Sequence, residues 1–223
     1  MTVFSQELRS EAKAIWERIF THPFLVELSE GKLPISKFRF YIKQDHTYVR
    51  EYNRFLGLAI AKASTLELMK WLMNLMVFGF TMELEMQKRL IRKIGLTQTE
   101  VSSTELAPTA TAYISYLIQV ASVGSIGEIV AAMAPCTLTF VEIGRRMMKS
   151  KGLDKEPVYK EWCSFYASSE AEEAEQQFIE LLDTLAEKAT REEKDRMKRH
   201  FMTASRYEYM FWDMAYRQEA WPI

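Results

Sequence analysis

Apolar side chains recur along much of the chain at the spacing of one face of an α-helix. The clearest stripe follows Pro34, a residue type that is favoured at the first position of a helix. Its members are Phe38, Tyr41, Ile42, Asp45, Tyr48, Val49, Tyr52 and Phe55. The pattern predicts one long helix that begins at Pro34 and runs to about residue 63.

Similar stripes, with caps and breakers at their ends, predict helices in the rest of the chain. Ser125 with Glu128, and Thr190 with Glu193, each fit a capping box. The other predicted helices cover 5–20, a short turn around 25–28 that ends at Gly31, 66–93 with an end at Gly95, a helix from Pro108, 157–166, and one capped by Ser168 or Ser169. No Asn-Gly or Asp-Gly hairpin signal occurs. The sequence predicts an all-α fold, one domain over residues 1–223, as a bundle of seven to eight helices.

Two carboxylates interrupt these apolar stripes. Asp45 lies in the stripe after Pro34, and Glu208 lies in the stripe of the last helix, which consists of Met197, Phe201, Ala204, Glu208, Phe211 and Ala215. Burying a carboxylate alone costs several kcal/mol of folding free energy, so each needs a charged or hydrogen-bonding partner, or has a functional role. Asp45 could pair with an arginine of another helix or lie at the edge of its stripe, and Glu208 could reach solvent. In an apolar setting, however, the pKa of Glu208 would rise toward the range useful for proton transfer.

A thiol occupies a third apolar stripe, directly after a proline inside a helix. Cys136 follows Pro135, and the stripe contains Ile129, Met133, Cys136, Phe140, Ile143 and Met147. A buried cysteine is usually a small apolar residue, which is the plain structural interpretation. Proline in a helix interior removes one hydrogen bond, here to the carbonyl of Ala131, and kinks of this kind recur where helices open around a site. The pattern therefore makes Cys136 a candidate nucleophile.

Aromatic side chains on predicted core faces complete this group of candidates. They are Tyr41, Tyr48, Tyr113, Tyr116, Phe140 and Tyr166. Most such stripes are ordinary core, but several buried tyrosines also suit a flat heteroaromatic ligand held by stacking and hydrogen bonds. Cys136, Glu208 and Asp45 could then serve as nucleophile, acid/base and orienting carboxylate.

The composition of the chain limits the classes of binding partner that we expect. The 29 Lys and Arg residues against 30 Asp and Glu residues give a formal net charge of −1, so no field of the whole chain draws it to nucleic acid or to anionic lipid, and binding to either is disfavoured. Charges begin at Glu7, so we expect no signal peptide, and no later apolar run approaches the roughly 20 residues that a membrane span needs. Two cysteines are too few for a disulfide framework. We expect a cytoplasmic protein with no membrane partner.

Metal and cofactor signals are absent from the sequence. A carboxylate-bridged metal bundle needs Glu three residues before His, but Ile19, Lys43 and Met197 precede the three histidines at that spacing. His22, in the run THPF, could ligate haem, although the cap of a helix is its simpler role. We expect no metal and no cofactor.

Five segments resemble the TenA/thiaminase II family, in the order and at the spacings of that family. They are HPFLVELSEGKLPISKFRFYIKQDHTYV, APTATAYISYL, EIVAAMAPCTLTFVEIG, VYKEWCSFYAS and SRYEYMFWDMAYRQEAWP. The resemblance spans essentially the whole chain. It implies an all-helical, haem-oxygenase-like arrangement without haem, and a homotetramer.

The resemblance also implies a reaction in thiamin salvage. Members hydrolyse 4-amino-5-aminomethyl-2-methylpyrimidine or thiamin to 4-amino-5-hydroxymethyl-2-methylpyrimidine, and Cys136 is typical of the cysteine-containing branch. By resemblance, Cys136 is the nucleophile and Glu208 moves protons. Pyrimidine binding would fall to Asp45, Tyr48, Tyr113, Phe140 and Tyr166, with Phe140 standing where some relatives have tyrosine.

Two other function classes compete with the hydrolase. One is a non-catalytic pyrimidine-binding or regulatory protein on the same fold. The other is a metal- or cofactor-dependent oxidase, which the missing Glu and His spacing disfavours. The preferred pyrimidine substrate stays open.

Overall fold

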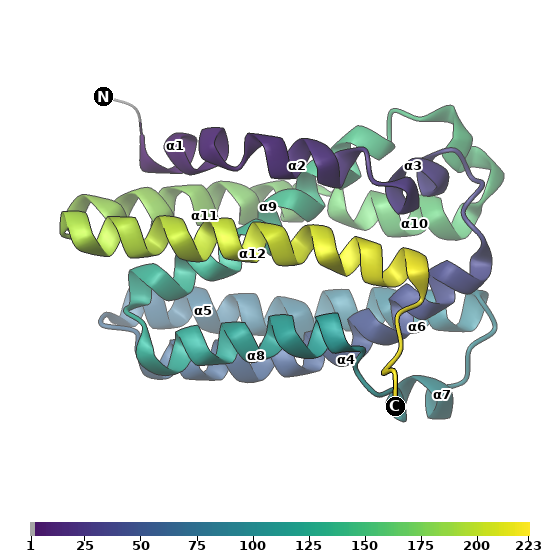
Figure 1. Ribbon diagram of the computed structural model, residues 1–223, viewed down its shortest axis with the longest axis horizontal. Coiled ribbons are helices and arrows are strands. Elements are labelled where there is room, and N and C mark those ends of the chain that lie inside the picture. Colours follow the sequence, from purple (N-terminus) through teal and green to yellow (C-terminus); the bar gives the residue numbers. More distant parts are fainter. Residues whose placement is uncertain (1–2) are drawn as a thin grey trace. The chain divides into compact units, whose positions relative to one another are not determined.

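The computed structural model describes residues 3–223, and within that range every regular element is a helix (Figure 1). The elements are α1 (Phe4–Glu11), α2 (Lys13–Phe20), α3 (Pro23–Ser29), α4 (Ile35–Ala61), α5 (Leu66–Phe78), η1 (Gly79–Glu83), α6 (Leu84–Lys93), α7 (Gln98–Ser102), α8 (Pro108–Val123), α9 (Ile126–Met147), η2 (Lys151–Lys155), α10 (Pro157–Tyr166), α11 (Ser169–Lys188) and α12 (Arg191–Arg217). The predicted all-α fold is confirmed.

The structure divides the helices more finely than the sequence suggested. Ala12 alone separates α1 from α2, so the predicted helix 5–20 is a nearly continuous pair. The predicted helix 66–93 is continuous, but its middle, η1, is one turn of π-helix. The short helix α7 was missed, although Thr97 and Glu100 form a complete capping box at its start.

Helix ends follow the signals in the sequence. Gly31 and Gly95 both adopt a positive φ, of 66° and 70°, which glycine tolerates without the steric cost that a side chain would add. Ser168 caps α11 by accepting a hydrogen bond from the amide of Ala171. Pro34 is the N-cap of α4 rather than its first helical residue, a shift of one position from the prediction.

The chain forms two compact units, each made of two stretches of sequence. Unit 1 comprises Met1–Lys32 and Gly127–Asp213, and unit 2 comprises Leu33–Ile126 and Met214–Ile223. Unit 1 therefore holds α1 to α3, α10, α11 and most of α9 and α12, whereas unit 2 holds α4 to α8. The single domain expected over residues 1–223 stays a prediction.

In unit 1, close backbone contacts and ion pairs fix the helices around α9. Arg9 of α1 pairs with Glu142 of α9 at 2.9 Å, and Ser5 donates to Asp183 of α11. Gly144 lets the end of α10 lie directly on α9, because a Cβ there would come within 2.7 Å of the carbonyl carbon of Tyr166. This contact sets the position of Tyr166.

In unit 2, α4 is the central helix and packs against α5, α6, α7 and α8. Gln44 ties α4 to the segment before α8, because it donates to the carbonyl of Glu105 and accepts from the amide of Ala107. Glu219, near the C-terminus, accepts a hydrogen bond from the amide of Thr109 in the first turn of α8. Both contacts fix the start of α8, the helix that carries Tyr113.

The expectation that no apolar run is long enough for a membrane span was wrong for α9. Its 22 residues include a window with a mean hydropathy of 1.5, which meets the length and composition of a span. However, 78% of that window is buried inside the protein. Such burial is typical of the core helix of a soluble protein, so α9 gives no indication of a membrane span.

Candidate active site

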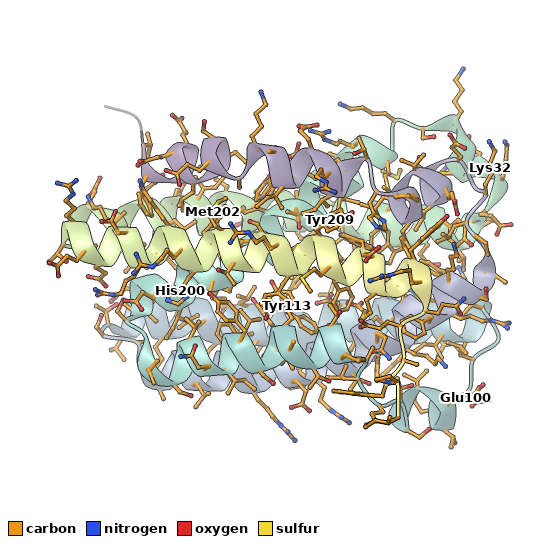
Figure 2. The ribbon with its side chains drawn as sticks, in the orientation of Figure 1. Lys32, Glu100, Tyr113, His200, Met202 and Tyr209 are labelled. Atoms are coloured by element: carbon orange, nitrogen blue, oxygen red, sulfur yellow. The ribbon has the colours of Figure 1, made fainter. Side chains whose placement is uncertain are left out.

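Helices α9 and α12 of unit 1 run parallel, and their contacts define a register. Near the start of both helices, Glu128 pairs with Arg196 at 2.5 Å and lies 3.4 Å from His200. Further along both helices, the rings of Phe140 and Trp212 lie 5.2 Å apart. Figure 2 labels His200 and Tyr209 along the same helix, α12. Positions on α9 thus match positions about 70 residues later on α12.

This register places Cys136 and Glu208 at the same level of the two helices. Cys136 lies four residues, about one helical turn, before Phe140, and Glu208 lies four residues before Trp212. Glu208 is buried and only 2% exposed, whereas Cys136 is half-buried. A thiol with some access and a buried carboxyl group therefore lie at the same level of two paired helices, as a nucleophile and an acid/base would.

Aromatic rings surround the next turn of the same two helices. The ring of Tyr166 lies 4.9 Å from that of Phe140, and the ring of Trp162 lies 5.0 Å from that of Tyr166. Trp212 closes the group, with its ring 6.0 Å from Trp162. Edge-to-face and tilted contacts of this kind hold rings rigidly and leave flat apolar walls.

The two cysteines differ in a way that the sequence pattern does not show. Cys163 of α10 is fully buried, its thiol points to the sulfur of Met147 at 3.8 Å, and burial raises the pKa of the thiol to about 12. Because only the thiolate is a good nucleophile, Cys163 is chemically inert at neutral pH. Cys136, which is half-buried, is the thiol with access.

Unit 2 brings together the predicted residues of α4 and α8. The rings of Tyr48 and Tyr113 lie 5.4 Å apart, and Figure 2 labels Tyr113 on α8. Asp45 precedes Tyr48 by three residues and so shares its face of α4, and both side chains are buried. Asp45 accepts a hydrogen bond from the side chain of Gln87 at 2.8 Å.

Gln87 and Trp212 are residues of these two groups that the sequence reasoning missed. Gln87 lies on the apolar stripe of α6 with Leu90, Ile91 and Ile94, all of them buried. A polar residue on such a stripe is the same signal that identified Asp45. Trp212 lies one turn after Glu208 on α12, so its place on that face was also readable.

Two of the predicted stripe members are less buried than expected. Tyr52 and Tyr116 are half-buried rather than core residues. Both lie at the edge of the buried face of their helix, where the 3.6-residue period drifts away from the core. They are therefore weaker candidates for ligand contact than Tyr48 and Tyr113.

His22 takes the structural role that was weighed against haem ligation. It is the N-cap of α3, and its Nδ1 accepts a hydrogen bond from the amide of Phe24 at 3.2 Å. Within residues 3–223, no group of three or more His, Cys, Asp or Glu side chains is arranged to hold a metal ion.

A cleft of about 660 Å³ in unit 1 lies away from these residues. Four of its charged lining residues form two ion pairs, Arg9 with Glu142 and Arg145 with Glu175, each at 2.9 Å. Burial raises the pKa of Glu175, although Arg145 opposes that effect. None of the predicted site residues lines this cleft.

Comparison with known proteins decides the family. The sequence profile of the TENA/THI-4/PQQC family matches residues 9–218. This chain belongs to the TENA/THI-4/PQQC family. The resemblance to TenA proteins that the sequence motifs indicated is confirmed.

Relatives of this family match the chain over nearly its full length. The aminopyrimidine aminohydrolase of Halalkalibacterium halodurans is 35% identical over 98% of this chain and 97% of its own. The structure of a TenA homologue from P. horikoshii OT3 superposes with a TM-score of 0.88 and 32% identity, covering 97% of this chain and 99% of that protein.

A more distant structure shows the fold alone. A domain of unknown function with a haem-oxygenase-like fold, from Shewanella denitrificans, gives a TM-score of 0.76 at 17% identity, covering 96% of this chain and 92% of that one. The predicted haem-oxygenase-like arrangement is confirmed.

Proposed function

We propose that this protein is an aminopyrimidine aminohydrolase of thiamin salvage. It hydrolyses 4-amino-5-aminomethyl-2-methylpyrimidine, or thiamin, to 4-amino-5-hydroxymethyl-2-methylpyrimidine. The full-length relative from Halalkalibacterium halodurans, an aminopyrimidine aminohydrolase, supports this reaction. The observation that carries the proposal in the structure is the register of α9 and α12, which sets Cys136 level with Glu208.

The chemistry belongs to unit 1. Cys136 adds as thiolate to the pyrimidine ring, and Glu208 gives a proton to the departing amine and takes one from the incoming water. Expulsion of the thiolate then breaks the carbon–sulfur bond and restores the aromatic ring and the free Cys136. With the aminomethyl substrate, water enters and ammonia leaves, so the exocyclic carbon exchanges its amino group for a hydroxyl. The presence of Cys136 supports membership of the cysteine-containing branch of the family. The half-buried position of Cys136, against full burial of Cys163, supports this choice of nucleophile.

Pyrimidine recognition uses five further side chains. In unit 2, Asp45 receives the amino edge of the pyrimidine, and Tyr48 and Tyr113 contribute rings and hydroxyl groups. In unit 1, Phe140 and Tyr166 contribute flat surfaces for stacking. The ring contacts within each unit support these roles, because rings that are already held against each other lose little entropy when a ligand binds.

The reaction is tested directly by incubating the purified protein with the aminomethylpyrimidine and measuring released ammonia. Thiamin is tested in parallel by following its loss. A hydrolase releases ammonia in proportion to the hydroxymethylpyrimidine formed. Tight binding of hydroxymethylpyrimidine without turnover of either substrate would instead identify a non-catalytic pyrimidine-binding protein.

The assembly in this proposal is a cytoplasmic homotetramer of single-domain chains. The family profile covers parts of both units, which supports one domain. Met73, Val77 and Phe80 recur on one face of α5 and η1 and are exposed, as apolar residues of a subunit interface are before assembly. Light scattering after gel filtration gives the mass, and a monomer in solution would refute the assembly.

A further inference from the structure

Behind Asp45, two further side chains of unit 2 form a chain of hydrogen bonds. Gln87 of α6 donates from Nε2 to Oδ2 of Asp45 at 2.8 Å. The other end of the same amide, Oε1, lies 2.9 Å from Nδ1 of His46. Gln87 is fully buried, and Asp45 is only 4% exposed. The three side chains thus connect α4 to α6 at the residue assigned to the substrate.

The charge of the Asp45 carboxylate determines which groups donate and which accept along this series of hydrogen bonds. An ionised carboxylate only accepts hydrogen bonds, so Gln87 must turn its NH₂ group toward Asp45 and its oxygen toward His46. Nδ1 of His46 must then carry the proton. Burial lowers the pKa of His46, opposed by the hydrogen bond to Gln87 and assisted by the charges of Arg50 and Lys88. The lowered pKa favours the neutral form of His46, and the contact with Oε1 of Gln87 then favours the tautomer with its proton on Nδ1.

A neutral donor holds a carboxylate without cancelling its charge. An arginine or lysine at position 87 would neutralise Asp45 and compete with any cationic or amino group of a ligand. The amide of Gln87 instead holds one oxygen of the carboxylate without adding a positive charge beside it. A carboxylate that must receive the amino edge of a pyrimidine, or a protonated ring nitrogen, needs both properties.

We propose that Gln87, oriented by His46, is a positioning residue that holds the carboxyl group of Asp45 correctly turned for the aminopyrimidine. The inference rests on the proposed function, which assigns Asp45 to the substrate. Gln87 touches the substrate only through Asp45, so its loss affects binding more than the chemical step.

The protein offers a matched control for the proposed role of Gln87. Gln44 is also a buried glutamine next to Asp45 on α4, but its amide bonds only backbone groups, the carbonyl of Glu105 and the amide of Ala107. Gln44→Met removes a buried glutamine with purely structural contacts. Gln87→Met removes one of the same size that contacts Asp45.

The test compares these variants by calorimetric binding of 4-amino-5-hydroxymethyl-2-methylpyrimidine and by kcat and KM for the aminomethylpyrimidine. Gln87→Met should raise Kd and KM about ten- to a hundredfold, the range for one hydrogen bond to a charged group, while kcat changes much less. Gln44→Met should lower the melting temperature and change KM much less than Gln87→Met does, because Gln44 acts on the start of α8 and not on Asp45. In the Asp45→Asn background, Gln87→Met should add little, because the two residues act as one unit.

A second variant keeps the test valid if Gln87→Met fails to fold. Gln87→Glu preserves volume and still accepts the hydrogen bond from His46. Two carboxyl groups at this distance share a proton, so Asp45 loses part of its charge and pyrimidine binding weakens. Unchanged Kd in a folded Gln87 variant, with weakened binding in Asp45→Asn, would overturn the inference and leave the proposed function intact. Unchanged binding in Asp45→Asn would overturn the inference and remove Asp45 from the pyrimidine site, whereas failure of the proposed function itself would appear as absence of ammonia release by the unmodified protein.

His46 is tested by a pair of substitutions. His46→Asn places an amide donor near the position of Nδ1 and should keep binding within about twofold, whereas His46→Leu leaves Gln87 without its second partner and should weaken binding severalfold. Equal pyrimidine binding by the two variants would show that His46 does not orient Gln87.

Discussion

The two units hold their candidate residues by different physical means. In unit 1, the positions of Cys136 and Glu208 follow from the register of α9 and α12, which contacts at Glu128 and at Phe140 set on either side. In unit 2, a directional hydrogen bond from Gln87 reaches Asp45 itself.

This difference separates the proposed reactive groups, Cys136 and Glu208, from Asp45, which is proposed to bind the pyrimidine. Helix register is shared among many packing contacts, so it survives when one reactive atom changes. A directional hydrogen bond depends on single atoms, and its loss disturbs the angle and charge of the group that it holds. We therefore expect substitutions of Cys136 and Glu208 in unit 1 to abolish turnover with binding retained, and substitutions of Asp45 and Gln87 in unit 2 to act mainly on binding.

The largest expected effect is the loss of the thiol of Cys136. Cys136→Ser keeps the volume nearly constant, so the protein should fold, but a hydroxyl cannot add to the ring. Turnover should fall by about 10⁴-fold or more, as when an established nucleophile is removed. Ammonia release measures the loss, and binding of hydroxymethylpyrimidine should persist.

Cys163→Ala serves as the control for that variant. It removes the other thiol, which lies fully buried on α10. It should melt at a lower temperature and keep most of its turnover. Near-normal hydrolysis by Cys136→Ser would end the covalent mechanism.

A second prediction compares the two thiols in the folded protein. Burial raises the pKa of Cys163 from 9.0 to about 12, so at any pH below 9 its thiolate fraction is lower than that of an ordinary thiol by roughly a thousandfold. Iodoacetamide at pH 8 should therefore label Cys136 and leave Cys163 intact, as read by peptide mass spectrometry. In guanidinium chloride both should react, and equal labelling of the folded protein would contradict the burial of Cys163.

The third prediction concerns the buried acid of unit 1. Glu208→Gln conserves volume, and it should lower kcat by about 100-fold, the usual range for a lost general acid/base. The ascending limb of the pH profile should flatten, since the group that titrates there is gone. If kcat stays and only the melting temperature falls, Glu208 has a structural role.

The smallest expected effect tests the packing that sets the aromatic wall. In Gly144→Ala, the new Cβ would lie 2.7 Å from the carbonyl carbon of Tyr166, and backbone cannot yield as a side-chain tip does. The variant should lose about 1–3 kcal/mol of stability, and KM should rise a fewfold as Tyr166 shifts from Phe140.

Gly57→Ala is the matched control for that substitution. Gly57 lies within helix α4, and a Cβ added there would meet only the tip of the Met76 side chain, at 4.0 Å. Alanine in an open helix position should raise stability by about 0.5–1 kcal/mol. Thermal unfolding followed by circular dichroism reads both variants, and equal shifts would disprove the close approach at Gly144.

Much of the fold was readable because helix periodicity and caps are local. Pro108, Gly31, Gly95 and Ser168 marked helix boundaries correctly, since each acts on backbone groups within a few residues. The π-helical turn inside 66–93 was not readable, because its wider spacing leaves no distinct residue signal.

The sequence by itself determined which side chains face the core and which of those carry chemistry. Asp45, Glu208 and Cys136 stood out as reactive groups on apolar stripes, and the motifs around them indicated the family. Helix periodicity gives the face of a residue but not its depth, so only the structure showed that Cys136 is half-buried and Cys163 fully buried.

Only the tertiary structure decided which distant residues meet. The sequence separates Asp45 from Gln87 and Glu128 from Arg196 by many residues, and nothing local specifies such pairs. Helix register in unit 1 and the direction of the Gln87 amide in unit 2 arise from packing and charge summed over several helices, which is why no stretch of sequence encodes them alone.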